Sequence, residues 1–144
     1  MLFEKIEKEN KDIVFVYTTC PNKDEAKSIG QAAIDKQLAV CADLWPINSI
    51  YLWQKVIQDV NQYMLMMTTQ KSLGKRLIKF VSGIHSYKVP FVVECSTQVS
   101  NSLYHLWVDK TLKGKSGYVT EYQDKILKKN KKQRKQGYNP GKLK

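Results

Sequence analysis

Two short stretches of this sequence are apolar on both of the faces that a strand would present, and this pattern limits the possible folds more than any other feature. Residues 12–19 read DIVFVYTT, and residues 63–67 read YMLMM. A run of this kind, with β-branched and aromatic residues prominent in the first, predicts a strand in the interior of a sheet. We therefore expect a sheet with these two stretches at its centre.

The other elements alternate between helix and strand patterns. Asn22 is a suitable N-cap for a helix, with Glu25 at the position that completes a capping box. Pro46 interrupts the next strand, and because proline lacks the N–H that a sheet ladder needs, that strand is expected at an edge or with a bulge. The expected elements after the first strand are a helix over residues 22–37, strands over 40–53 and 58–69, a helix over 73–84, a strand from residue 90 and a short helix from about residue 100.

This order, β-α-β-β-α-β followed by a C-terminal helix, is typical of the ferredoxin-like α+β fold with an antiparallel sheet. In that topology the first and third strands are central, in agreement with the two apolar runs. Right-handed crossovers place both helices on one face of the sheet. The other face would then expose apolar side chains, and further copies of the chain are the simplest cover for such a patch. The pattern therefore predicts an oligomer.

The positive charge of the chain is concentrated at its C-terminal end. Residues 113–144 contain eleven Lys and Arg and two acidic residues, whereas residues 1–112 contain thirteen and eleven. We therefore divide the chain into a nearly neutral domain, 1–112, and a basic extension, 113–144, expected to be partly helical or disordered. The first twelve residues are rich in charged side chains, unlike a signal peptide. No apolar run approaches the ~20 residues that cross a bilayer, so a cytoplasmic protein is expected.

Three motifs follow one another along the domain. They are L-A-x-C at residues 38–41, S-x-Y-x-W at 49–53 and H-x-Y-x-x-P at 85–90. In this order they resemble the CutA family of divalent-cation tolerance proteins, and the resemblance covers roughly residues 12–112. It implies a ferredoxin-like fold and a homotrimer, in which extended hairpins of the second and third strands pair between subunits.

The resemblance also suggests where a cation, copper or another divalent ion, would bind. Cys41 and His85 occupy matching positions, and imidazole is the commonest metal ligand in proteins. The alternative for Cys41 is core packing, and for His85 a structural hydrogen bond. Four aromatic residues would line a cleft between subunits, unless they only pack at the trimer interface. They are Tyr51, Trp53, Tyr87 and Trp107.

The sequence departs from the family at several polar positions. Gln54, Thr68 and Phe91 are neutral where the family carries charge, and Ser86 replaces a proline in the turn after His85. A site that relied on a carboxylate at these positions would be weakened, and whether it is abolished stays open. The trimer scaffold uses apolar and aromatic positions, which the departures leave unchanged.

The remaining sulfur-containing residues are expected to be structural. Cys20 ends the first strand before a proline and is expected to be more exposed, whereas Cys95 shares a strand face with apolar residues and is expected in the core. Strand alternation places Met67 on the opposite face from Met64 and Met66, so these three cannot form one Cu(I) site.

No catalytic motif is present, and we expect a protein that is not an enzyme. The leading hypothesis is a CutA-like trimer that contributes to cation tolerance by binding the metal. One alternative is a PII-like signalling trimer that binds a small anion. Another is an interaction scaffold whose basic tails contact nucleic acid or a membrane by counterion release, unless the tail is simply solvated. The tail residues concerned are Lys128, Lys129, Lys131, Lys132, Arg134 and Lys135.

Overall fold

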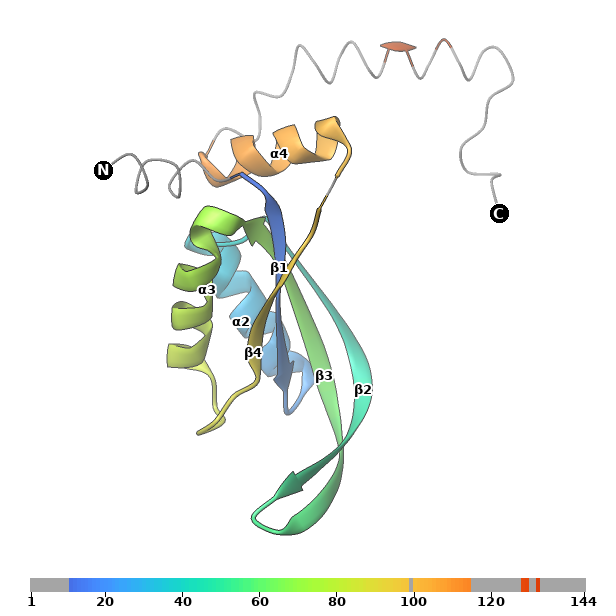
Figure 1. Cartoon of the computed structure of the whole chain (residues 1–144), viewed down its shortest axis with the longest axis vertical. Helices are drawn as coiled ribbons and strands as arrows, with labels where there is room; N and C mark the ends of the chain where they lie inside the picture. Colours follow the sequence, from blue (N-terminus) through green and yellow to red (C-terminus); the bar gives the residue numbers. More distant parts are fainter. Residues whose placement is uncertain (1–10, 99, 115–127, 130–131, 133–144) are drawn as a thin grey trace.

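The structure, a computed structural model, describes residues 11–98, 100–114, 128–129 and 132. Figure 1 shows a single curved sheet with helices on both of its faces. The elements are β1 (Ile13–Cys20), α2 (Lys23–Asp35), β2 (Cys41–Trp53), β3 (Val56–Gln70), α3 (Lys71–Ile84), β4 (Val92–Ser96) and α4 (Ser102–Leu112).

The sheet has the strand order β2-β3-β1-β4, and every neighbouring pair is antiparallel. The two strands expected at the centre are there, and β2, which contains Pro46, is an edge strand. This confirms the predicted ferredoxin-like α+β fold. The β2–β3 hairpin is long and turns at Gln54 and Lys55, both with positive φ, 48° and 66°. Positive φ at both central residues is the geometry of a two-residue type I′ turn, which suits the twist of the strands.

Helices α2 and α3 cover one face of the sheet (Figure 1). The core beneath them is built from β1 and β3 on one side and the two helices on the other. Gly30 of α2 lies against β2 so closely that a Cβ at this position would be 2.8 Å from the Cβ of Ala42. Buried residues of this core include Val16, Ile29, Leu65, Met67, Leu77 and Val81.

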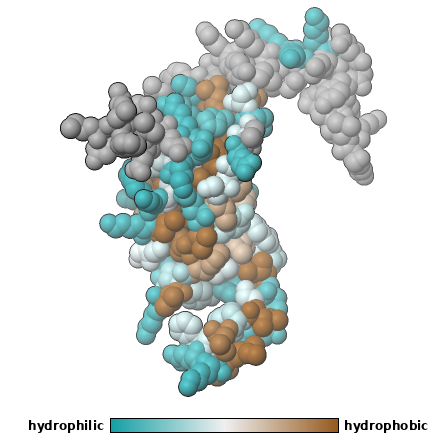
Figure 2. Space-filling view, viewed as in Figure 1, coloured by the Kyte–Doolittle hydropathy of each residue, from teal (hydrophilic) through white to brown (hydrophobic). Residues whose placement is uncertain are grey.

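The opposite face is covered at one end only, by α4. Ile13, Val40 and Val108 are buried there, with Tyr104 and Trp107 packed against them. The Asn101 side chain caps this helix by accepting a hydrogen bond from the Tyr104 N–H at 2.8 Å. The rest of this face exposes large apolar side chains, and so does the hairpin. Figure 2 shows apolar residues along this side and at the lower end of the molecule. The exposed residues include Trp45, Ile50, Leu52, Val56, Ile57, Phe91 and Val93.

Two cysteine expectations were wrong, for the same physical reason. Cys20 is completely buried, because its side chain points to the face that α2 and α3 cover. Cys95 is exposed, because it pairs with Phe15 and points to the opposite face, beyond the part that α4 covers. The side of each residue follows from strand alternation, but which side is covered depends on where the helices dock.

Candidate functional site

The structure places the two predicted metal ligands near opposite ends of strand β1. Cys41 pairs with Thr68, which in turn pairs with Phe15 of β1. His85 instead contacts Thr19, four residues further along β1. At the rise of a strand, four residues correspond to roughly 13 Å. Cys41 and His85 therefore do not form one site within a chain.

The surroundings of Cys41 are those of a packed, half-buried thiol. Its Sγ donates a hydrogen bond to Asp43 Oδ2 at 3.4 Å and lies 3.7 Å from the hydroxyl oxygen of Thr68. Burial raises the pKa of the Cys41 thiol, and Asp43 raises it further, although the hydrogen bond with Thr68 acts in the opposite direction. The thiol therefore stays protonated and only weakly nucleophilic near neutral pH.

His85 lies instead beside two residues that the sequence did not single out as ligands. The Sγ of Cys20, a carboxylate oxygen of Glu25 and a ring nitrogen of His85 all lie within 4.8 Å of one another. The Cys20 residue and the His85 side chain are completely buried, and the Glu25 side chain is 21% exposed. These are three ligand types that bind transition metals, gathered at the edge of the core.

Three elements end or begin at this cluster. Cys20 is the last residue of β1, Glu25 lies in the first turn of α2, and His85 caps the C-terminus of α3. The Asn22 side chain fixes the start of α2 by accepting a hydrogen bond from the Glu25 N–H at 2.8 Å. This confirms Asn22 as the N-cap. The Glu25 carboxylate, however, hydrogen-bonds to Ser86 at 2.9 Å rather than closing a capping box.

The hydrogen bonds of His85 determine which ring nitrogen is free to bind a cation. Nε2 lies 2.9 Å from the backbone oxygen of Thr19, which can only accept, so Nε2 carries the proton. Nδ1 accepts the N–H of Tyr87 at 3.1 Å, so it carries a lone pair. The Glu25 carboxylate lies 3.9 Å from the same Nδ1. A backbone carbonyl that holds one ring nitrogen is a common way to orient the other toward a metal.

The thiol of Cys20 is held in its protonated form. Burial, helped by the charge of Glu25, raises the pKa of Cys20 to about 11. A cation that bound here would have to displace the thiol proton, as thiolate-binding metals do. One sequence signal pointed to this cluster: Cys20 ends the first strand and Glu25 begins the next helix. However, only the docking of α3 brings His85 to them.

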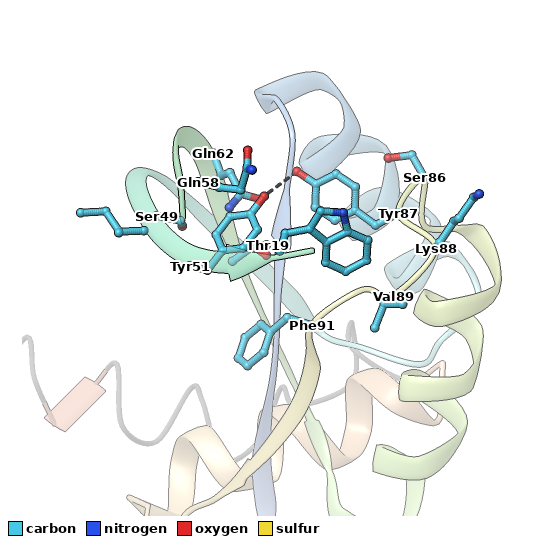
Figure 3. Close-up of a pocket in the computed structure, with 12 residues that line it drawn as sticks. Thr19, Ser49, Tyr51, Gln58, Gln62, Ser86, Tyr87, Lys88, Val89 and Phe91 are labelled. Atoms are coloured by element: carbon cyan, nitrogen blue, oxygen red, sulfur yellow. Dashed lines mark hydrogen bonds between the residues drawn. The ribbon is translucent and has the colours of Figure 1, made fainter. Parts of the chain in front are cut away.

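A pocket of about 650 Å³ lies next to the cluster, between the hairpin and the segment after α3 (Figure 3). It brings together Tyr51, Trp53 and Tyr87 of the predicted cleft. The Tyr87 hydroxyl donates to Gln62 Oε1 at 2.8 Å, which links the two walls. Burial raises the pKa of Tyr87, so this hydroxyl stays a donor. Trp107 is not in this pocket and stacks on Tyr104 at 5.7 Å between ring centroids.

The other singled-out positions are spread over the molecule. Gln54 lies in the hairpin turn, Thr68 is buried, and Phe91 lines the pocket. The basic residues Lys128, Lys129 and Lys132 are helical and exposed. The predicted contacts Lys131, Arg134 and Lys135 lie outside the described residues. In the part of the chain that the structure describes, no helix is long and apolar enough to span a membrane.

Comparison with known proteins identifies the family. A family model described as CutA1 divalent ion tolerance protein matches residues 14–111. The chain belongs to the CutA1 family. Protein CutA of Homo sapiens is 36% identical over 105 residues, which are 72% of this chain and 59% of that protein. This chain therefore spans less than two thirds of the length of its human relative. Both the cluster and the pocket lie within the matched region.

Solved CutA structures have the same fold. The crystal structure of CutA1 from Oryza sativa matches with a TM-score of 0.67 and 31% identity, over 69% of this chain and 93% of that one. The periplasmic divalent cation tolerance protein CutA from Archaeoglobus fulgidus matches with a TM-score of 0.68 and 25% identity, over 69% and 98%. The family match over residues 14–111 spans the elements from β1 to α4.

Proposed function

We propose that this CutA1-family protein contributes to divalent-cation tolerance by binding the cation directly, without catalysing a reaction. Copper or another divalent ion is the expected cargo. The observation that carries the proposal is the position of His85, whose Nδ1 lone pair lies beside a carboxylate and a thiol at the edge of the core. These residues fit a transition metal, because imidazole, thiolate and carboxylate are its usual protein ligands.

A titration of the purified full-length protein tests this proposal. Chelator-treated protein should bind Cu²⁺ or Zn²⁺ in isothermal titration calorimetry with a defined stoichiometry per chain, and His85→Ala should weaken that binding. His105→Ala is the matched control, because His105 lies on α4 and outside the cluster. If the wild-type protein binds neither ion under conditions in which it is folded, direct binding is excluded as its function.

We also propose that the protein works as a homotrimer. The support is the sheet face that α4 covers only in part, together with a hairpin whose Leu52 and Ile57 are 70% and 72% exposed. Contiguous exposed apolar surface of this kind marks an interaction site. Light scattering that shows a stable monomer at micromolar concentration would contradict this assembly.

A second candidate function is the binding of a small anion, as in a PII-like signalling trimer. The observation that favours it is the pocket beside the cluster, whose lining includes Lys88 and Ser86 as well as Tyr51. Equilibrium dialysis with nucleotides and inorganic phosphate tests it, with Lys88→Gln as the variant that should lose binding. Retention of affinity in that variant would remove the charge-based argument.

Two further points belong to the proposal. The exposed Lys128, Lys129 and Lys132 support contact with a polyanion through the basic extension.

A cytoplasmic location is supported by three free thiols, Cys20, Cys41 and Cys95, since reducing compartments preserve such groups. The names of two relatives give other compartments, one chloroplastic and one periplasmic. Fractionation of the source cells is therefore the test.

A further inference from the structure

We propose that Cys20, Glu25 and His85 form a binding site for a thiophilic cation such as Zn²⁺, Cd²⁺ or Cu⁺, and that filling this site releases the Tyr87 amide from its hydrogen bond to His85. The inference rests on the proposed cation-binding function and names its ligands and cation class. It replaces the predicted pair of Cys41 and His85, which the fold separates.

The geometry requires only small side-chain movements. Around a zinc-sized ion the sulfur and nitrogen ligands would lie roughly 3.5 Å apart, so ligand atoms now within 4.8 Å need to close by about 1 Å. His85 is held in place by the backbone oxygen of Thr19, with Nδ1 as the unprotonated nitrogen. Glu25 is on the first turn of α2 and is the most exposed of the three, so it has the greatest freedom to move.

The ligand set selects the class of cation. A thiolate and an imidazole favour Zn²⁺, Cd²⁺ and copper, whereas Mg²⁺ and Ca²⁺ require mainly oxygen ligands. Cys20 and the His85 side chain are completely buried, so no ring of water molecules can complete a hydrated Mg²⁺ sphere on their side.

Two hydrogen bonds now reach the groups that a cation would use. The Ser86 hydroxyl donates to Glu25 Oε2 at 2.9 Å, and the Tyr87 N–H donates to His85 Nδ1 at 3.1 Å. A neutral imidazole nitrogen has a single lone pair, so a cation on Nδ1 must displace the Tyr87 N–H, whereas the carboxylate keeps further lone pairs beside its hydrogen bond from Ser86. Ser86 and Tyr87 also line the adjacent pocket (Figure 3). Cation binding should therefore alter one wall of that pocket.

Titrations of the full-length protein with Zn²⁺, and with Mg²⁺ as the negative probe, test the site. Cys20→Ser and Glu25→Gln should each weaken Zn²⁺ binding by at least about tenfold, the size of effect that even outer partners of metal ligands show. Cys95→Ser, an exposed thiol on another face, should bind as the wild type does. Ser86→Ala should bind Zn²⁺ at least as tightly as the wild type, because the Glu25 carboxylate is no longer shared with a hydroxyl donor.

A second measurement reports on the released amide. In hydrogen-exchange NMR, the Tyr87 amide should be protected in the cation-free protein and should lose that protection when Zn²⁺ binds.

Since Cys20 is fully buried, circular dichroism should confirm that Cys20→Ser is folded, and Glu25→Gln gives the same test at a more exposed position. If Cys41→Ser weakens binding and both cluster variants do not, the site is overturned while the proposed function stands. If the wild type binds neither Zn²⁺ nor Cu²⁺, both fail.

Discussion

Gln70 and Asp109 join the end of β3 to α4 through a buried hydrogen bond of 3.1 Å. Both residues are 6% exposed. Lys113 and Lys11 approach the same carboxylate from solvent, at 3.1 Å and 3.7 Å. Asp109→Ala leaves the Gln70 amide without its acceptor and should destabilise the fold by about 1–3 kcal/mol. Denaturant unfolding measures this cost. Asp109→Asn keeps an acceptor oxygen and should lose less stability. If both variants lose the same stability, the hydrogen bond with Gln70 does not account for the loss.

The same carboxylate should contribute to stability in a pH-dependent way. Burial raises the pKa of Asp109, but the hydrogen bond from Gln70 and the charges of Lys113 and Lys11 outweigh it, and the pKa is lowered overall. The stabilisation is therefore complete above the pKa of an unfolded aspartate, about 4, and is lost as the pH falls through the lower folded value. Thermal unfolding between pH 2 and pH 7 measures this effect. Between these pH values the Asp109→Asn variant should lose less stability on acidification than the wild type, because the other carboxylates contribute equally to both.

Two glycines of the helices should respond in opposite ways to the same substitution. A Cβ on Gly30 would lie 2.8 Å from the Ala42 Cβ, whereas a Cβ on Gly83 would meet no atom within 4 Å. Alanine is favoured over glycine in a helix by about 1 kcal/mol, but overpacking a core contact costs about 1–3 kcal/mol. Gly83→Ala should therefore stabilise the protein and Gly30→Ala should destabilise it, as measured by urea unfolding. A stabilised Gly30→Ala would mean that α2 moves away from β2 at little cost.

The hairpin is the place to test the assembly. Leu52 and Ile57 are cross-strand partners and are the two most exposed apolar residues of the hairpin. The double variant Leu52→Asp, Ile57→Asp should keep the fold of the single chain, since neither side chain is buried there, but should shift the molar mass toward a monomer. Lys75→Asp on α3 controls for the added negative charge. An unchanged mass in light scattering would place the interface elsewhere.

Deletion of residues 128–144 should separate the basic extension from the folded domain. The described core residues all precede this segment, so circular dichroism and molar mass should remain those of the full-length protein. Affinity for RNA or acidic vesicles should fall sharply, and in the intact protein it should decrease steeply with added salt. Absence of salt-sensitive binding in the intact protein would leave the extension with a solubility role only.

The sequence by itself determined the strand order and the presence of one open apolar face on the sheet. Both follow from local periodicity: β1 and β3 are apolar on two faces, Pro46 belongs on an edge strand, and Asn22 begins a helix. The motif around His85 also indicated the family. These signals are local or depend on alternation along one strand, so they can be read without knowing the register.

Only the tertiary structure decided which side chains meet. Cys41 and His85 seemed a natural pair from the motifs, but the strand registers and the contact of His85 with Thr19 place them near opposite ends of β1. Cys20 was expected to be exposed and Cys95 buried, and the docking of α2 and α3 on one face reverses both. The convergence of Cys20, Glu25 and His85 depends on three elements ending at one point. No periodicity within a single element encodes that, because it results from the packing of helices on the sheet.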